Sequence, residues 1–359
     1  MALLKAIIIL ISTKLDNGLN KMNFEDSLKD KIKQLDIKKP QHALLVKQII
    51  EYWASLKDTG INNRLLQDLV LKYSAAGKKL KQLNQELLDK QKRLDADLAA
   101  AAQIQKSLLP QKINSAENMA LAWKFEPCEH MGGDIFNMFQ LDEDHWAIYM
   151  LDVSGHGVEA AMITVSVAQF LQLNSGHLFK PKSGRPSQTH HLRTPAEVLT
   201  ALDAEFPFDR FDNFFTITYM LINTKSGNLR YSNAGHPHSI ILRRNGNLEL
   251  LQKGGPVIGM GDFHLLSDQK NRFEEGRLEI DPGDKLFVYT DGIVEYQRPD
   301  NELFGTERFC ETLESLRAES VHDIVEKTIK SLMNFGNNAK PQDDITLLGL
   351  ELKTIGTNI

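Results

Sequence analysis

The spacing of apolar residues divides the chain into a helical first part and a later part of strands and turns. Over residues 24–109, apolar side chains recur every three or four positions, as on one face of an α-helix. No stretch there alternates as a half-buried strand would. We therefore expect a helical regulatory module over residues 1–76. Residues 1–21 of this module are either a loose arm or a segment ahead of the true start at Met22.

An uninterrupted helix is expected from just after Gly77 to Pro110. One seam repeats every seven positions, as in a coiled coil: Leu80, Leu87, Leu94, Ala101 and Leu108. The companion seam is poor, because it includes Lys90 and Asp97 in one reading. We predict a linker helix over residues 77–110 that forms a weak or adjustable dimerisation stalk. A single helix packed on its own chain is the alternative.

The pattern from residue 111 to residue 355 predicts an α+β domain in which sheets pack together under helices. Strands are expected at 119–125, 145–151, 214–222, 228–233, 239–243, 248–251 and 285–290 and after Asp344, and helices at 157–173, 194–206, 306–316 and 321–335. The helix at 194–206 opens with TPAE, a capping box with proline at the first helical position.

Composition excludes several classes of protein. The chain has 359 residues with 42% hydrophobic content, and its two cysteines are too few for a disulfide framework. This favours a reducing cytoplasm. The apolar run at residues 6–11 is far shorter than the roughly 20 residues of a membrane span. Residues 1–112 carry 20 basic and 12 acidic groups (+8) and the rest 22 and 35 (−13). The lysines are scattered among leucines with few aromatics, which favours a solvated helical surface over a nucleic-acid or membrane partner.

Acidic residues stand where predicted strands end. In WAIYMLDVSGHG an apolar strand ends at Asp152, and Gly155 and Gly157 bend the chain before a helix. Corresponding positions are held by Asp134, Asp291 and the pair Asp343 and Asp344. Capping could explain one such acid. It is a poor explanation of all four sites, because sheet cores do not require acids at successive strand ends.

Converging carboxylates repel one another unless cations neutralise them, so we infer a site for two Mn²⁺ or Mg²⁺ ions. Two ions sharing Asp152 could hold a water that ionises easily and attacks phosphorus in line. This chemistry requires no protein nucleophile. The sequence contains no Cys-based phosphatase loop, Walker motif or Ser-His-Asp arrangement.

A series of ordered motifs carries a family resemblance. AAQIQKSLLP, GGDIF, LDVSGHG, NAGHP, YTDGIVE, FGTERF and DDITLL follow one another between residues 99 and 352. The chain thereby resembles the SpoIIE/RsbU-type branch of the metal-dependent (PPM-type) serine/threonine protein phosphatases. The resemblance implies an αββα sandwich with a two-metal centre at one edge. It also implies a phosphoprotein substrate of the anti-sigma-factor antagonist type, in a partner-switching pathway.

The resemblance also assigns roles by position. Asp152 would bridge both metals with the Val153 carbonyl adding an oxygen, and Asp291 and Asp343 would complete the first metal. Asp134 would lie in the site directly or through water, and Asp344 is the alternative to Asp343. A phosphate or outer-shell contact is one hypothesis for a further set: His156, Gly133 and Gly292. The alternatives are that His156 stabilises its turn and that Gly132, Gly133 and Gly292 permit close approach of the backbone.

Four residues at the end of the linker helix are expected to be regulatory: Gln103, Gln105, Leu108 and Leu109. They would control whether the helix at 157–173 lets the acids assemble the metals, in response to an unknown protein regulator of the first module. The family pattern is departed from at two places. Asn137 stands where an acid is frequent, which would weaken an outer metal contact, and the loop at 175–193 is long.

Two rival functions remain from the sequence. One is a non-catalytic scaffold of the same fold that binds a phosphoprotein, and a related alternative is a phosphatase for an unrelated phosphoprotein. The other is a diguanylate cyclase, suggested by Gly132, Gly133, Asp134 and Phe136. That match is weak, because Ile135 replaces the acid expected in its motif.

Overall fold

The computed structural model describes residues 63–110, 118–155, 157–179, 192–260 and 272–354. The chain divides into two compact units, Met1–Lys92 and Arg93–Ile359. The predicted module at residues 1–76 lies largely outside the described residues.

Helix α4 spans Asn63–Ser107, so it begins well before the predicted start after Gly77. A single glycine lowers the stability of a helix by only about 1 kcal/mol relative to alanine, so the helix can continue through Gly77. Three of the seam leucines are more than half exposed in the single chain: Leu80, Leu87 and Leu94. Their exposure leaves room for a partner helix, and the coiled-coil dimer stays a prediction.

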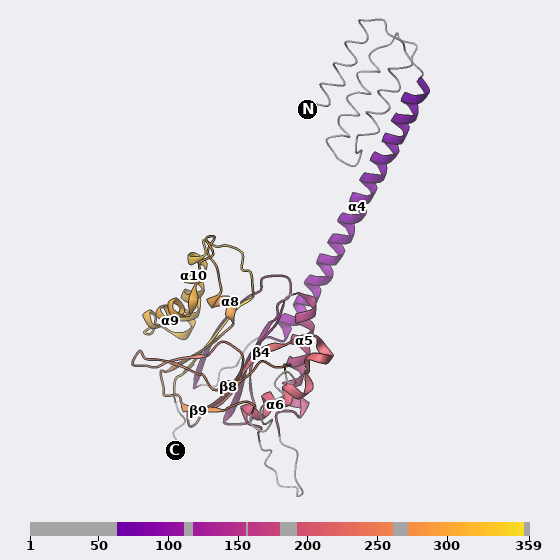
Figure 1. The fold of residues 1–359 in the computed structure, drawn as a ribbon. Helices are drawn as coiled ribbons and strands as arrows, with labels where there is room; N and C mark the ends of the chain where they lie inside the picture. The colour runs from indigo at the N-terminus through magenta and orange to yellow at the C-terminus, as the bar shows by residue number, and fades with distance from the viewer. Residues whose placement is uncertain (1–62, 111–117, 156, 180–191, 261–271, 355–359) are drawn as a thin grey trace. The chain divides into compact units, whose positions relative to one another are not determined.

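Two sheets form the body of the second unit (Figure 1). One contains, in spatial order, β1 (Met119–Glu126), β11 (Ile345–Leu352), β10 (Lys285–Tyr289), β6 (Ile240–Leu242) and β7 (Leu248–Leu250). The other contains β2 (Asp134–Gln140), β3 (His145–Val153), β4 (Phe215–Asn223), β5 (Asn228–Ala234) and β8 (Gly254–Gly255), with β9 (Gly276–Glu279) also paired to β5. Neighbouring strands are antiparallel except β5 and β8. Strand β2 was not predicted, and neither were the short β8 and β9, because two to four residues carry no periodicity.

Helices cover the outer faces of both sheets. Helices α5 (Val158–Phe170) and α6 (Pro195–Glu205) contact the sheet of β2 to β5, and α10 (Val321–Phe335), beside α9 (Gly305–Ser315), contacts β1 and β11. The short pieces are η1 (Leu173–Ser175), α7 (Phe208–Phe211) and α8 (Asp291–Val294). The prediction of sheets packed together under helices is confirmed.

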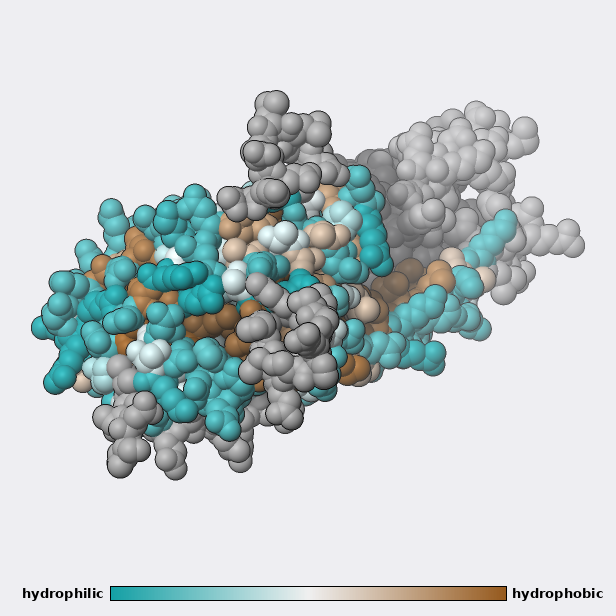
Figure 2. Space-filling model, turned by 90° about the horizontal axis from the view of Figure 1, so that it is seen from below, coloured by the Kyte–Doolittle hydropathy of each residue, from teal (hydrophilic) through white to brown (hydrophobic). Residues whose placement is uncertain are grey.

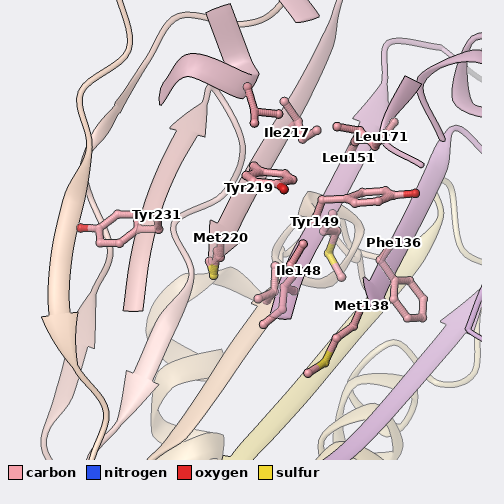
Figure 3. Packing of buried hydrophobic residues seen from close by; sticks show 14 of the residues in the cluster. Phe136, Met138, Ile148, Tyr149, Leu151, Leu171, Ile217, Tyr219, Met220 and Tyr231 are labelled. Carbon is pink, nitrogen blue, oxygen red and sulfur yellow. The ribbon is translucent and has the colours of Figure 1, made fainter. Parts of the chain in front are cut away.

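The central strands are apolar on both faces because each face is covered. Strand β3 has six consecutive buried residues, from Trp146 to Leu151, and Tyr149 lies opposite Tyr219 of β4. Figure 3 shows these two rings among the buried side chains of β2, β3 and β4. The acids at the strand ends are therefore attached to a closely packed interior.

Hydrophilic residues predominate on the face shown in Figure 2, with hydrophobic residues in smaller patches between them. None of the described helices is both long and apolar enough to cross a membrane.

The predicted capping box at α6 is confirmed and can be tested. The Thr194 side chain accepts from the Glu197 N–H, and the Glu197 carboxylate accepts from the Thr194 N–H. We expect Thr194→Ala to lower the free energy of unfolding by about 1 kcal/mol in urea denaturation. Thr200→Ala is the control, because the exposed Thr200 hydroxyl bonds only the Ala196 carbonyl of its own helix. Equal unfolding midpoints for the two variants would contradict the expectation.

Candidate metal centre

Both sheets bring acidic residues to one edge. Asp134 begins β2 and lies directly opposite Asp152 near the end of β3. Asp291 follows the end of β10, and Asp343 precedes the start of β11. Because β10 and β11 are antiparallel neighbours, the end of one and the start of the other share an edge.

Burial and mutual repulsion favour the protonated forms of these carboxyl groups. Burial raises the pKa of Asp152 from 3.8 to about 8, and the nearby charges of Asp291 and Asp343 act in the same direction. Burial, followed by the charge of Asp343, raises the pKa of Asp291 to about 6. The acids of separate strand ends therefore form one electrostatic cluster around Asp152.

Asp134 ties the two sheets together. It is 2% exposed, and its Oδ2 accepts hydrogen bonds from the hydroxyls of Thr290, after β10, and Thr346, in β11. Burial, and then the charge of Asp152, raises the pKa of Asp134 well above its usual value, while the two threonine bonds oppose this. Asp134 thus lies beside Asp152, with one carboxylate oxygen occupied by contacts across the sheets.

The pair before β11 divides into a buried and an exposed acid. Asp344 is 2% exposed; its Oδ1 accepts from the Cys128 N–H at 2.8 Å and its Oδ2 from the Asp134 N–H at 3.3 Å. Asp343 is exposed, and its Oδ1 accepts from the Asp344 N–H at 2.8 Å. Asp344 therefore holds backbone in place, and Asp343 is the more accessible carboxylate.

Two glycines allow this close packing. A Cβ on Gly132 would lie 2.2 Å from Asp344 Oδ2, and one on Gly292 would lie 2.0 Å from the Asp344 carbonyl oxygen. Neither space could hold a side chain. For Gly292 the structure thus gives a reason in backbone packing, whereas its predicted phosphate contact stays a prediction.

Three oxygens face a small space beside Gly133. A Cβ there would lie 2.8 Å from the Val153 carbonyl oxygen, 3.2 Å from the Gly155 carbonyl oxygen and 3.4 Å from Asp152 Oδ1. Side-chain and main-chain oxygens are the ligands that hard divalent cations prefer. The Gly155 carbonyl was not predicted, because the sequence does not show where a carbonyl points.

No group of three His, Cys, Asp or Glu side chains in the described ranges has the arrangement of a preformed metal site. The oxygen-rich space beside Gly133 nevertheless fits Mg²⁺ or Mn²⁺ by donor type. Mg²⁺ is usually held by one or two carboxylates and keeps several of its waters, so it does not require three gathered side chains.

The remaining predicted residues are distributed differently. His156 lies outside the described residues. At the end of α4, Gln105 and Leu109 are buried, Leu108 is half-buried and Gln103 is exposed. Only Gln105 of the two glutamines therefore faces the body of the domain.

Asn137, which from the sequence would weaken an outer metal contact, binds two backbone groups in the structure. It lies in the middle of β2, and its Nδ2 donates to the Leu108 carbonyl at 3.3 Å. Its Oδ1 accepts from the Met138 N–H. The amide therefore fastens the end of α4 to β2, a contact in which an aspartate could not donate.

Two other residues of the sequence motifs, His236 and Cys128, have surroundings that indicate a structural role. His236 is buried, which lowers its pKa to about 3, and its backbone exchanges two hydrogen bonds of 2.7 Å with the Asn233 side chain. It anchors its loop as a neutral ring. Burial, then the charge of Asp344, raises the pKa of Cys128 to about 12, so its buried thiol stays protonated.

Thr290 and Thr346 were missed by the sequence reasoning. Each stands within two residues of a predicted acid, in YTDG and DDIT. A search for hydroxyl donors beside the acids could have found them. The partner of each hydroxyl, Asp134, is more than 150 positions away, so only the fold identifies the contact.

Comparisons with known proteins agree with this architecture. Protein IcfG of Synechocystis is 28% identical over 280 residues, covering 74% of this chain and 43% of that protein. Phosphoserine phosphatase RsbP of Bacillus subtilis is 26% identical over 258 residues, covering 72% of this chain and 58% of that protein. The chain thus spans about half the length of these two relatives.

Among solved structures, the SiaA-PP2C domain of Pseudomonas aeruginosa shares the fold, with a TM-score of 0.58 and 20% identity. The match covers 73% of this chain and 98% of that one. The family model described as Stage II sporulation protein E (SpoIIE) matches residues 142–353, which is more than half of the chain. By this match, and with the fold and the edge of acids just described, the chain belongs to the SpoIIE family.

Proposed function

We propose that this chain is a metal-dependent protein phosphatase acting on phosphoserine or phosphothreonine. The observation that carries the proposal is the cluster of acids around Asp152 at one edge of two packed sheets, where Val153 and Gly155 add carbonyl oxygens. Its relatives RsbP and RsbU of Bacillus subtilis are both named phosphoserine phosphatases. The diguanylate cyclase alternative loses its support, because the GGD turn belongs to this cluster.

The residues divide into ligands and supports. We assign Asp152, the Val153 carbonyl, Asp291 and the exposed Asp343 as the groups that would hold two Mn²⁺ or Mg²⁺ ions. When bound, such ions supply an ionised water as nucleophile and neutralise charge on phosphoryl oxygens. Asp134 supports the site indirectly, because one of its oxygens already binds two threonine hydroxyls.

A pocket beside these acids gives room for the substrate. It has a volume of about 400 Å³ and is lined by Gly292 and Asp343 together with Arg298 and Lys340. Arg298 is paired with Glu302, whereas Lys340 is exposed and can meet an anionic group. A phosphorylated protein segment of the anti-sigma-factor antagonist type is our proposed substrate, within a partner-switching pathway. The free thiols Cys128 and Cys310 suit a reducing compartment such as the cytoplasm.

Replacing individual acids tests the activity. We expect Asp152→Asn, Asp291→Asn and Asp343→Asn each to lower Mn²⁺-dependent hydrolysis of p-nitrophenyl phosphate and of a phosphoserine peptide by about 100-fold or more, because each removes a charged ligand. Glu295→Gln is the matched control, since this exposed acid lines the same pocket without a proposed metal contact. Wild-type rates in all three Asp variants would favour the non-catalytic phosphoprotein-binding scaffold instead.

The raised pKa values also predict how stability depends on pH. Between the usual Asp value of 3.8 and about 8, folded Asp152 keeps a proton that the unfolded chain has released. The folded state then binds more protons than the unfolded state, so stability falls as pH rises through this window. Asp291 acts in the same direction up to about 6.

In EDTA, we therefore expect the thermal midpoint of the wild type to decrease as the pH is raised from 5.5 to 8. The thermal midpoint of Asp152→Asn should decrease less over the same range. At pH 8 this inactive variant should be more stable than the wild type, because the repelling charge is gone. Differential scanning fluorimetry with and without Mn²⁺ measures this. A variant that is less stable than the wild type at pH 8 in EDTA would refute the electrostatic argument.

Regulation is proposed to enter through α4. The first module would respond to a protein regulator, the exposed seam would pair two copies, and the end of α4 would bias the acids through α5. Such control requires two states of this helix that the partner distinguishes.

Truncation tests this regulatory role. We expect deletion of residues 1–95 to lower the basal rate at least about fivefold, because the short helix that remains is too marginal to stay ordered. Deletion of residues 1–62, which keeps all of α4, should leave the basal rate nearer to that of the full chain. Unchanged basal rate and unchanged partner response after removal of 1–95 would exclude the idea.

A further inference from the structure

The end of α4 is fastened to the turn that begins β2. Gln105 Nε2 donates to the Gly132 carbonyl at 2.6 Å, and the Gly132 N–H donates to Gln105 Oε1 at 3.2 Å. One side-chain amide thus satisfies both backbone polar groups of Gly132. Gln105 is 4% exposed, so the pair of bonds is shielded from water.

Burying a glutamine at this position is costly unless both ends of its amide are bonded. Apolar residues fill the neighbouring positions, so packing alone would not require a glutamine here. Ala102, three positions before Gln105, forms a small buried cluster with Met131, which precedes Gly132, and with Ala161 of α5. A leucine would satisfy such packing, whereas only an amide offers the donor and the acceptor that Gly132 needs.

The turn is held from its other side by α5. The Thr164 hydroxyl donates to the Gly133 carbonyl at 3.0 Å, and that carbonyl also accepts from the Val153 N–H at 3.2 Å. The Asp134 N–H is held by Asp344. Three consecutive residues of the turn are thus fixed by α4, by α5 and by the loop before β11. Gly133 is also the residue around which the candidate metal oxygens gather.

We propose that Gln105 is a positioning residue, which fixes the Gly132–Gly133–Asp134 turn so that the oxygens beside Gly133 stand ready for a divalent cation. The proposal rests on the proposed function and deepens its regulation. An α-helix turns by about 100° per residue, so rotation of α4 by one position would break both bonds together. Gln103 was grouped with Gln105 as regulatory from the sequence, but its side chain is exposed and has no bond to this turn, so it provides a matched control.

The test compares Gln105→Ala, Gln105→Glu and Gln103→Ala in the full chain. We expect Gln105→Ala to raise the Mn²⁺ concentration for half-maximal hydrolysis about tenfold, with the rate at saturating Mn²⁺ largely restored. Gln105→Glu keeps the acceptor but sets an oxygen against the Gly132 carbonyl, so it should be no better than alanine. Gln103→Ala should stay within about twofold of the wild type.

Two further measurements do not depend on turnover. Hydrogen exchange of a peptide covering Gly132 should be faster in Gln105→Ala than in Gln103→Ala, and the rise in thermal midpoint at a fixed low Mn²⁺ concentration should be smaller. A wild-type Mn²⁺ midpoint and wild-type exchange in Gln105→Ala would overturn the proposal. Failure of saturating Mn²⁺ to restore that variant would also overturn it, in favour of a general loss of folding.

The outcomes separate the two proposals. If the wild type hydrolyses no phosphoester with Mn²⁺, the proposed function fails. Exchange at Gly132 and the Mn²⁺-dependent midpoint still decide whether Gln105 positions the turn.

Discussion

The carboxylates at one edge of the two sheets repel one another, and the packing of the rest of the domain holds them there despite this repulsion. Each loses hydration on burial, and each charge opposes the ionisation of its neighbours. The opposing force comes from the packing of the two sheets, with aromatic and branched residues such as Tyr149 and Tyr219 filling the interior. The acids of different strands thus keep fixed positions at some cost in stability, as is common in functional sites.

The support is divided among residues that do not themselves need to bind a cation. Asp134, in β2, accepts hydrogen bonds from two threonine hydroxyls of the other sheet's strands and their ends. Both carboxylate oxygens of Asp344 accept hydrogen bonds from backbone N–H groups. These hydrogen bonds stabilise each of the two buried carboxyl groups. Asp152 and Asp291 are half-buried and Asp343 is exposed, and these three are the acids that we propose as metal ligands. Within one motif, DDITLL, the adjacent aspartates before β11 therefore have different surroundings, since Asp343 is exposed and Asp344 is buried.

Much of this could be predicted from the sequence where the information is local. Alternation and apolar runs predicted most of the strands, and TPAE predicted a cap that the structure contains. The glycines beside Asp134, Asp152 and Asp291 predicted which edge of the sheets carries the site. What could not be predicted depends on contacts between distant residues. Periodicity cannot show that Asp344 binds the Cys128 N–H, or that the Gly155 carbonyl oxygen lies beside Gly133, because backbone direction is set by the folded loop.

The departure at Asn137 shows why a motif difference needs its surroundings before it is interpreted. From the sequence, an amide in place of an acid implied a weaker metal site. In the structure the Asn137 amide of β2 donates to the carbonyl of Leu108, just after α4, and Gln105 of α4 binds Gly132, two residues before β2. Two amides thus join one helix to one strand through donors that carboxylates lack. The amide at position 137 thus adds a fixed contact between β2 and the residue that follows α4, which an ionised carboxylate could not make.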